Sequence, residues 1–173
     1  MNALLSKSRM VLCGLVLLAT TISLSACDSG GDDSGLTIDD IVGTYTFSQL
    51  SFNPEAAAIM DANVLDTLVA AQTSFRLFED GSLNLNYQFQ NGSPAFVPGS
   101  FTLNDDEIRV DLDDSFGNQR RAILLPDEFT LQVVGTGSQL QADIDRNGVN
   151  MADFSDFYSG VTTNGTLVIR LRR

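Results

Sequence analysis

The chain has 173 residues, 43% of them hydrophobic, and a formal net charge of −12 that comes from 22 acidic residues against 10 basic ones. It contains no histidine and no tryptophan. This excludes Ser-His-Asp and Cys-His catalysis, His-ligated zinc or haem, and the stacking of sugars on tryptophan. The negative charge makes nucleic acid and anionic lipid head groups poor partners. We therefore expect a protein that is not an enzyme and does not bind nucleic acid.

The first 26 residues have the three zones of a secretory signal peptide. Lys7 and Arg9 give a positive start, and residues 11–24 form an apolar run that is short for a membrane span. The run ends in Leu-Ser-Ala-Cys at positions 24–27, which resembles the lipobox of bacterial lipoproteins. The resemblance implies that Cys27 becomes the mature N-terminus and carries two or three acyl chains, palmitate among them, enough for stable anchoring. The alternative is an ordinary secretory signal followed by a chance cysteine.

Residues 27–37 are expected to form the lipid-bearing cysteine and a flexible acidic tether. Positions 28–35 read Asp-Ser-Gly-Gly-Asp-Asp-Ser-Gly and contain no apolar side chain that could pack. We therefore expect a protein anchored through its lipid to a membrane of the bacterial cell envelope. An aspartate directly after the lipid-bearing cysteine resembles an inner-membrane retention signal, whereas an acidic run there resembles a surface-export signal. The choice between inner membrane, outer membrane and cell surface stays open.

Residues 38–173 are enough for one domain with its own core. Of the two cysteines, Cys13 leaves with the signal and Cys27 is lipidated in this interpretation, so no disulfide forms. The mature chain keeps eight arginines and no lysine against 22 acidic residues, which gives a net charge of −14. This composition resembles proteins of salt-loving bacteria, because salt screens the repulsion between like charges. The alternative is that the charge recruits cationic partners or metal ions.

Period-two alternation of apolar and polar side chains predicts a domain of short strands. The clearest run is residues 82–90, in which apolar residues alternate with Asn84, Asn86 and Gln88. Asp80-Gly81 and similar turn sequences separate the runs. Such short connections make successive strands antiparallel neighbours in a meander. The nine predicted strands are residues 42–50, 73–79, 82–90, 99–103, 107–113, 120–125, 129–134, 139–145 and 166–172.

Two segments depart from this pattern and favour helix. Asn53 has the character of an N-cap and Pro54 of a first helical residue, so residues 54–71 are predicted to form a helix after the first strand. A second short helix is predicted over residues 151–158. The apolar stripe of the first helix consists of Met60, Val64, Leu68 and Ala71.

Three short stretches carry a family signature. Residues 41–45, Ile-Val-Gly-Thr-Tyr, are similar to a first-strand Gly-x-Trp signature, with Tyr45 in place of tryptophan. Residues 78–83 are similar to a Phe-x-x-Asp-Gly hairpin, and residues 103–108 to the next strand-turn-strand unit. Together they resemble the bacterial lipocalin-like lipoproteins of the calycin group.

The resemblance implies an all-β fold, in which an antiparallel meander closes into a lipocalin-like β-barrel of eight to nine strands with a helix after the first strand. It also implies that an arginine of the last strand, Arg170 or Arg172, covers the ring of Tyr45. Closure would remove exposed sheet edges. An open sandwich of two sheets is the alternative fold.

The interior of such a barrel is the first candidate site, because eight strands enclose either packed side chains or one small ligand. We expect a small apolar ligand, with Arg120 or Arg121 at the rim to hold its polar end and the helix over residues 54–71 as a lid. The alternative is a filled barrel that serves as a structural or surface interaction module through loops such as residues 91–98. The ring residues expected to line the interior are Tyr45, Phe47, Phe75, Tyr87 and Phe89.

The second candidate site is a calcium loop, the one cofactor that the sequence suggests. Asp143, Asp145 and Asn147 alternate before Gly148, as do the first ligands of a calcium loop, and Asp153 is placed to close the site. Asp153 falls at position 11, however, where such a loop has a glutamate at position 12. The alternative is a polar hairpin turn.

The acidic pairs Asp111 with Asp113 and Asp105 with Asp106 are interpreted as solvated surface, and no catalytic residue is predicted. The oligomeric state stays open.

Overall fold

The computed structural model describes residues 35–113, 115, 123–151 and 161–173. Contacts divide the chain into two units, residues 1–33 and residues 34–173, and every described residue belongs to the second. Within the described ranges no helix is long and apolar enough to cross a membrane. The predictions for Cys27, Arg120, Arg121, Asp153 and residues 152–158 lie outside the described residues and stay predictions.

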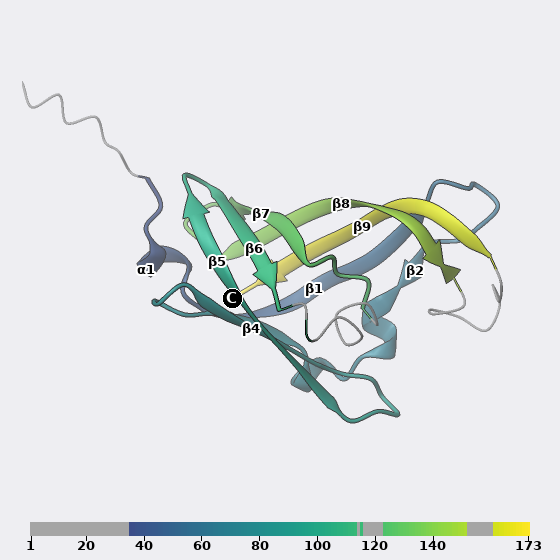
Figure 1. The fold of residues 1–173 in the computed structure, drawn as a ribbon, viewed down its shortest axis with the longest axis horizontal. Coiled ribbons are helices and arrows are strands. Elements are labelled where there is room, and N and C mark those ends of the chain that lie inside the picture. The colour runs from purple at the N-terminus through teal and green to yellow at the C-terminus, as the bar shows by residue number, and fades with distance from the viewer. Residues whose placement is uncertain (1–34, 114, 116–122, 152–160) are drawn as a thin grey trace, which may run out of the picture. The chain divides into compact units, whose positions relative to one another are not determined.

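In its described part, the second unit has one antiparallel sheet and three short helical turns (Figure 1). Eight of the nine predicted strands are present, several of them longer than expected. The strands are β1 (Gly43–Pro54), β2 (Ala62–Asn63), β3 (Ser74–Leu77), β4 (Ser82–Gln88), β5 (Pro94–Asn104), β6 (Glu107–Leu112), β7 (Glu128–Val134), β8 (Gln139–Asn150) and β9 (Thr162–Arg172). The helical turns are α1 (Ile38–Ile41), η1 (Val64–Thr67) and η2 (Ala70–Gln72).

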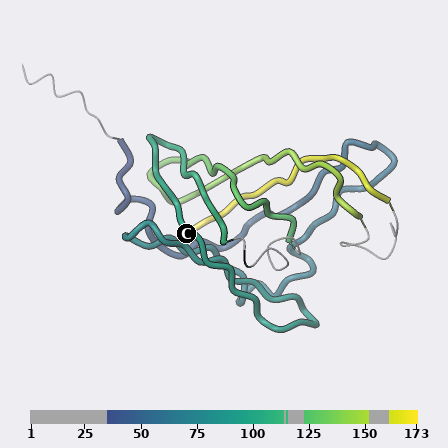
Figure 2. The backbone as a smooth tube through the Cα atoms, in the orientation of Figure 1, coloured from purple at the N-terminus to yellow at the C-terminus, as the bar shows by residue number. Residues whose placement is uncertain are grey.

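The sheet closes on itself through β1. The strand order is β2-β1-β3-β4-β5-β6-β7-β8-β9, and β1 also pairs with β9. Residues 43–46 of β1 pair with β3, and residues 46–54 pair with β9. Eight strands therefore form a closed antiparallel barrel, and β2 is a short ninth strand on β1. This confirms the all-β meander, and the open sandwich is not formed. Figure 2 shows β8 and β9 running side by side over most of their length.

Alternation places one face of each strand in the barrel interior. In β4, Leu83, Leu85 and Tyr87 are buried, while the intervening amide residues lie on the outer face. The buried side chains of the described residues form one core cluster, and all of its members belong to the second unit. Because the barrel closes and fills itself from these residues, we expect residues 34–173 to fold on their own.

The predicted strand over residues 120–125 is wrong in its described part. Residues 123–124 form a turn and residue 125 follows it outside any strand; all three side chains are buried, and Leu124 has a φ of 65°. A strand at the barrel wall would have sent alternate side chains to solvent. The turn and the residue after it bury all three of these consecutive apolar side chains inside the barrel. The free energy gained by this burial outweighs the cost of the positive φ at Leu124.

The single helix predicted over residues 54–71 is also wrong. Strand β1 runs on to Pro54, which pairs with Gly165 of β9, and Ala62 pairs back onto Phe52. Only the two 3-10 turns, η1 and η2, remain helical in this stretch. Of the predicted stripe, Val64 and Leu68 are buried but Met60 is 73% exposed. The burial of Val64 and Leu68 holds the segment across the barrel. This tertiary packing outweighs the helix propensity of the sequence.

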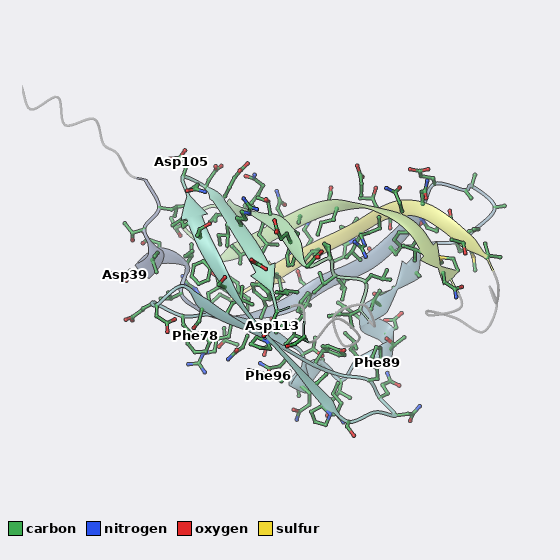
Figure 3. The ribbon with its side chains drawn as sticks, viewed as in Figure 1. Asp39, Phe78, Phe89, Phe96, Asp105 and Asp113 are labelled. Carbon is green, nitrogen blue, oxygen red and sulfur yellow. The ribbon has the colours of Figure 1, made fainter. Side chains whose placement is uncertain are left out.

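One end of the barrel is closed by α1 and three tight hairpins. Strand β1 begins here and β9 ends here, so the turns at 78–81, 105–106 and 135–138 gather at the same end. Asp39 and Asp105 mark this end, and Phe89 lies at the other (Figure 3). Ile41 of α1 is fully buried and acts as the floor of the core.

Tyr45 joins α1 to the barrel floor. Its hydroxyl donates toward the carbonyl oxygens of Ile41 and Gly137, at 2.8 and 2.6 Å. The arginine that covers the Tyr45 ring is Arg173, whose guanidinium carbon lies 5.8 Å from the ring centroid. The expectation of Arg170 or Arg172 is therefore wrong. Arg170 and Arg172 lie at alternate positions of β9 and line a groove among outward-facing glutamines. Arg173 follows the strand and can therefore fold back over the floor of the barrel.

Candidate functional site

The predicted ring residues do gather at the barrel interior. Tyr45, Phe75 and Tyr87 are buried, and Phe47 and Phe89 are half-buried against the same core. The rings of Tyr87 and Phe89 meet edge to face, with centroids 5.6 Å apart. The alternation that predicted these positions therefore identified the interior wall correctly.

The space between these side chains is too small for a ligand. An apolar gap lies among six side chains and has no room for a water molecule. Pockets that enclose a drug-sized ligand typically occupy about 300–1,000 Å³. The described part of the barrel is therefore filled by its own side chains. The gap is lined by Phe47, Phe75, Leu125, Phe129, Ile169 and Leu171.

The end opposite α1 is plugged by residues that the sequence analysis had assigned elsewhere. Val64 and Leu68 of the η1 segment are buried there, as is Met151 at the end of β8. Backbone hydrogen bonds hold this segment against β4 and its extension: the Val69 amide donates to the Gln88 carbonyl at 2.7 Å, and the Gln90 amide donates to the Thr67 carbonyl at 3.0 Å. A segment expected to be a movable lid is thus pinned into the wall.

Burial raises the pKa of both interior tyrosines above its ordinary value. Desolvation is the main cause at Tyr45 and at Tyr87, and the charge of Arg173 acts in the opposite direction at Tyr45. Both hydroxyls therefore stay protonated at neutral pH. They can donate hydrogen bonds but cannot act as general bases there.

An arginine that the sequence analysis did not single out belongs to the barrel wall. Arg146 follows Ala142 and Ile144 at the inward-facing positions of β8 and is half-buried, with its Nε atom shielded from solvent. Continuing the alternation by one more step would have found it. The alternating acidic residues of the same stretch favour a calcium loop, which competes with the strand pattern in the sequence.

The suggested calcium ligands lie on a strand, not in a loop. Asp143, Asp145 and Asn147 alternate along the exposed face of β8, and Asp143 accepts a hydrogen bond from Arg170 at 2.7 Å. Alternate residues of a strand stand about 6.5–7 Å apart, so these side chains do not converge on one cation. Among the described residues no group of three or more acidic, cysteine or histidine side chains is placed to hold a metal. Asp153 is not described, and calcium binding stays a prediction without support from β8.

Gly148 explains why this stretch resembles a calcium loop. The register of β8 against β9 shifts between Arg146 and Val149, and Gly148 has a φ of 67° within that bulge. Its amide donates to the Asn164 side chain at 3.1 Å. The glycine thus serves a bulge in the strand, which needs the same left-handed conformation as a cation loop.

The acidic pairs are exposed, as expected. Asp105, Asp106, Asp111 and Asp113 all lie on the surface. Hydrogen bonds from the hydroxyl and amide of Ser115 hold the pKa of Asp113 below its usual value. A carboxylate whose ionised form is stabilised in this way is unsuited to act as a general acid near neutral pH.

The outer face of β3, β4 and β5 is a further candidate site, distinct from the barrel interior and from the predicted calcium loop. Phe96 of β5 is 47% exposed and pairs with Asn86 of β4, which in turn pairs with Ser74 of β3 (Figure 3). Arg76 is the one charged side chain at the twelve outward positions of these described strands, although the domain is strongly acidic. Those positions are Ser74, Arg76, Ser82, Asn84, Asn86, Gln88, Pro94, Phe96, Pro98, Ser100, Thr102 and Asn104.

The strand order and the closure through β1 define the domain as a lipocalin-like β-barrel. No family model matches the sequence, and no curated protein matches it. Among solved structures, a lipocalin-like protein from Bacteroides uniformis ATCC 8492 is 17% identical, with a TM-score of 0.47 over 78% of this chain and 98% of that one. An uncharacterized protein from Bacteroides eggerthii DSM 20697 is 13% identical, with a TM-score of 0.41 over 76% of this chain and 98% of that one.

Proposed function

We propose that this protein is a lipid-anchored lipoprotein of the bacterial cell envelope whose filled barrel serves as a non-enzymatic module for surface interactions. The packed interior carries the proposal. A small apolar ligand would need a cavity to open beside Phe75 where there is now no room for a water molecule, and backbone hydrogen bonds fasten the η1 segment to β4 and the residues after it. Of the two hypotheses raised by the sequence, the filled barrel is the better supported.

The lipid anchor is supported by the sequence around Cys27. The apolar run, the Leu-Ser-Ala-Cys motif and the acidic tether precede α1, the first element of the barrel domain. A tether of this composition would keep the barrel away from the membrane surface. Replacement of Cys27 by alanine should abolish labelling with an alkyne analogue of palmitate and release the protein from the membrane fraction. Retention of both properties would exclude the anchor.

The outer face of β3, β4 and β5 is the surface that we assign to the interactions. An exposed ring surrounded by amides and prolines offers apolar contact together with hydrogen bonding, as protein interfaces do. The face carries no carboxylate, so a partner approaching it meets less of the domain's negative charge than elsewhere. It also includes residues 94–98, part of the segment that the sequence analysis favoured for contacts.

The proposal is tested by titrating residues 28–173 with cis-parinaric acid, a fatty acid that fluoresces when it enters an apolar cavity. We expect no saturable rise in fluorescence. The matched control is Phe75→Ala, which removes a buried ring beside the gap and should open space for the probe. Saturable binding by the unaltered protein would replace the proposal by the competing one, a barrel that carries a small apolar ligand.

A further inference from the structure

A groove on the outer surface of the barrel has a lining unlike the rest of the domain. It lies where β1, β8 and β9 run side by side near the end of β7, and it encloses about 240 Å³. Its side chains are hydroxyl, amide and guanidinium groups with some aliphatic ones, and no carboxylate lines it. The polar lining residues are Ser48, Gln49, Gln139, Gln141, Arg170 and Arg172.

The strand register arranges these side chains in two rows. Arg170 pairs with Gln49 on one side and Gln141 on the other, and Arg172 pairs with Gln139. Directly paired residues have Cβ atoms about 4.5–5.5 Å apart, and successive rows are about 6.5–7 Å apart. Arg170 thus has a glutamine on each side, and Arg172 has Gln139 on one side and Thr46 on the other, so the amides and guanidinium groups lie within reach of one small molecule.

A β-bulge creates the hollow. Phe47 pairs with Leu171 and Gln49 pairs with Arg170, so Ser48 is an extra residue in β1. Its hydroxyl donates to the Arg170 carbonyl oxygen at 3.1 Å and fixes the bulge. A bulge bends its strand and re-aims the neighbouring side chains, and this sets Gln49 beside the arginines.

The two arginines differ in how their charge is compensated. Arg170 is held by the Asp143 carboxylate at 2.7 Å and by the Ala142 carbonyl oxygen at 3.0 Å. Arg172 is exposed, and among the described residues its guanidinium has no hydrogen-bond or ion-pair partner. The groove therefore offers one uncompensated positive charge, in a protein whose formal net charge is −12.

We propose that this groove binds a small hydroxylated carboxylate, such as a sugar acid. Guanidinium groups pair with carboxylates through two parallel hydrogen bonds, and Arg172 supplies that fork. The glutamine amides each donate and accept, which suits the hydroxyl groups of a polyol. The groove is on the outer surface, so this inference goes beyond the proposed function and does not depend on the state of the barrel interior.

The test is calorimetric titration of residues 28–173 with D-glucuronate at low ionic strength, with D-glucose and acetate as comparison ligands. We expect glucuronate to bind at least about tenfold more tightly than either, because only glucuronate combines the carboxylate with the hydroxyl groups. Absence of binding at about 10 mM glucuronate would overturn the site. Glucose binding as tight as that of glucuronate would contradict the role of Arg172. Acetate binding as tight as that of glucuronate would contradict the role of the glutamines.

A pair of variants locates the binding. Arg172→Gln keeps a polar side chain without the charge and should weaken glucuronate binding by about tenfold or more. Arg109→Gln is the matched control, because Arg109 is an exposed arginine of β6 that pairs with Glu128 and does not line the groove. Circular dichroism checks that both variants fold. Wild-type affinity in Arg172→Gln, or an equal loss in Arg109→Gln, would contradict the proposal.

Discussion

Tyr45 and Arg173 close one end of the barrel together, although they stand at opposite ends of the domain sequence. The Arg173 guanidinium lies over the Tyr45 ring and donates to the Val42 carbonyl oxygen at 2.8 Å. The Tyr45 hydroxyl reaches the carbonyls of Ile41 and Gly137. The contact ties the first strand, the last strand, α1 and the turn between β7 and β8 into one floor.

Removing the Tyr45 hydroxyl should destabilise this floor without changing the barrel wall. In Tyr45→Phe the two carbonyl oxygens lose a buried donor, and we expect the free energy of unfolding to fall by about 1–3 kcal/mol. Urea denaturation followed by circular dichroism measures it. Ser100→Ala on the outer face is the control and should leave stability within about 0.5 kcal/mol. An unchanged Tyr45→Phe would mean that the hydroxyl contributes nothing to closure.

Alanine substitutions at two glycines of one turn should distinguish the cost of backbone strain from the cost of a steric clash. Gly135 and Gly137 both have positive φ, at 66° and 83°. A Cβ at Gly135 would meet nothing within 4 Å, whereas one at Gly137 would collide with the backbone oxygen of Asp40 in α1. Gly135→Ala should therefore cost about 1 kcal/mol, the strain alone. Gly137→Ala should cost a further 1–3 kcal/mol, roughly the cost of overpacking.

Thermal unfolding of the two alanine variants tests this difference directly. Equal melting temperatures would show that α1 does not press on the turn between β7 and β8. A larger loss in Gly135→Ala than in Gly137→Ala would contradict the packing of the floor.

Strand positions were predictable from the sequence because alternation depends only on which face is buried. Leu83, Leu85 and Tyr87 illustrate this. The segment between β1 and β3 was not predictable, since Val64 and Leu68 are positioned by the rest of the core and not by their neighbours in sequence. The groove at Ser48 was equally hidden, because a bulge depends on the register between β1 and β9.

Acid should weaken the fold in the range below the ordinary aspartate pKa. Hydrogen bonds from Ser82 lower the pKa of Asp80 from 3.8, and those from Thr37 do the same for Asp40. A carboxylate with a depressed folded-state pKa contributes stability that is present above the unfolded value and is lost as pH falls through the folded value. In Asp80→Asn, the free energy of unfolding in urea should fall less steeply with decreasing pH between about pH 6 and pH 2 than in the unaltered protein. An unchanged pH profile would mean that the hairpin of Asp80 does not contribute.

Salt should stabilise the protein, because the chain after the predicted signal peptide carries eight arginines against 22 acidic residues. The repulsion among these carboxylates is screened as the Debye length falls from about 10 Å at 0.1 M to about 3 Å at 1 M salt. We expect the melting temperature to rise steadily with sodium chloride over that range. A flat or falling profile would contradict the interpretation of the acidic surface as an adaptation to a saline medium.

The filled interior is tested most directly by native mass spectrometry of residues 28–173, purified without organic solvent and measured before and after organic extraction. The account predicts the mass of the bare chain in both measurements, because the gap among Phe47, Phe75 and Phe129 has no room for a guest. An apolar molecule that co-purifies in stoichiometric amount and leaves on extraction would contradict it. The barrel would then be a carrier whose interior opens, and the η1 segment would be its gate.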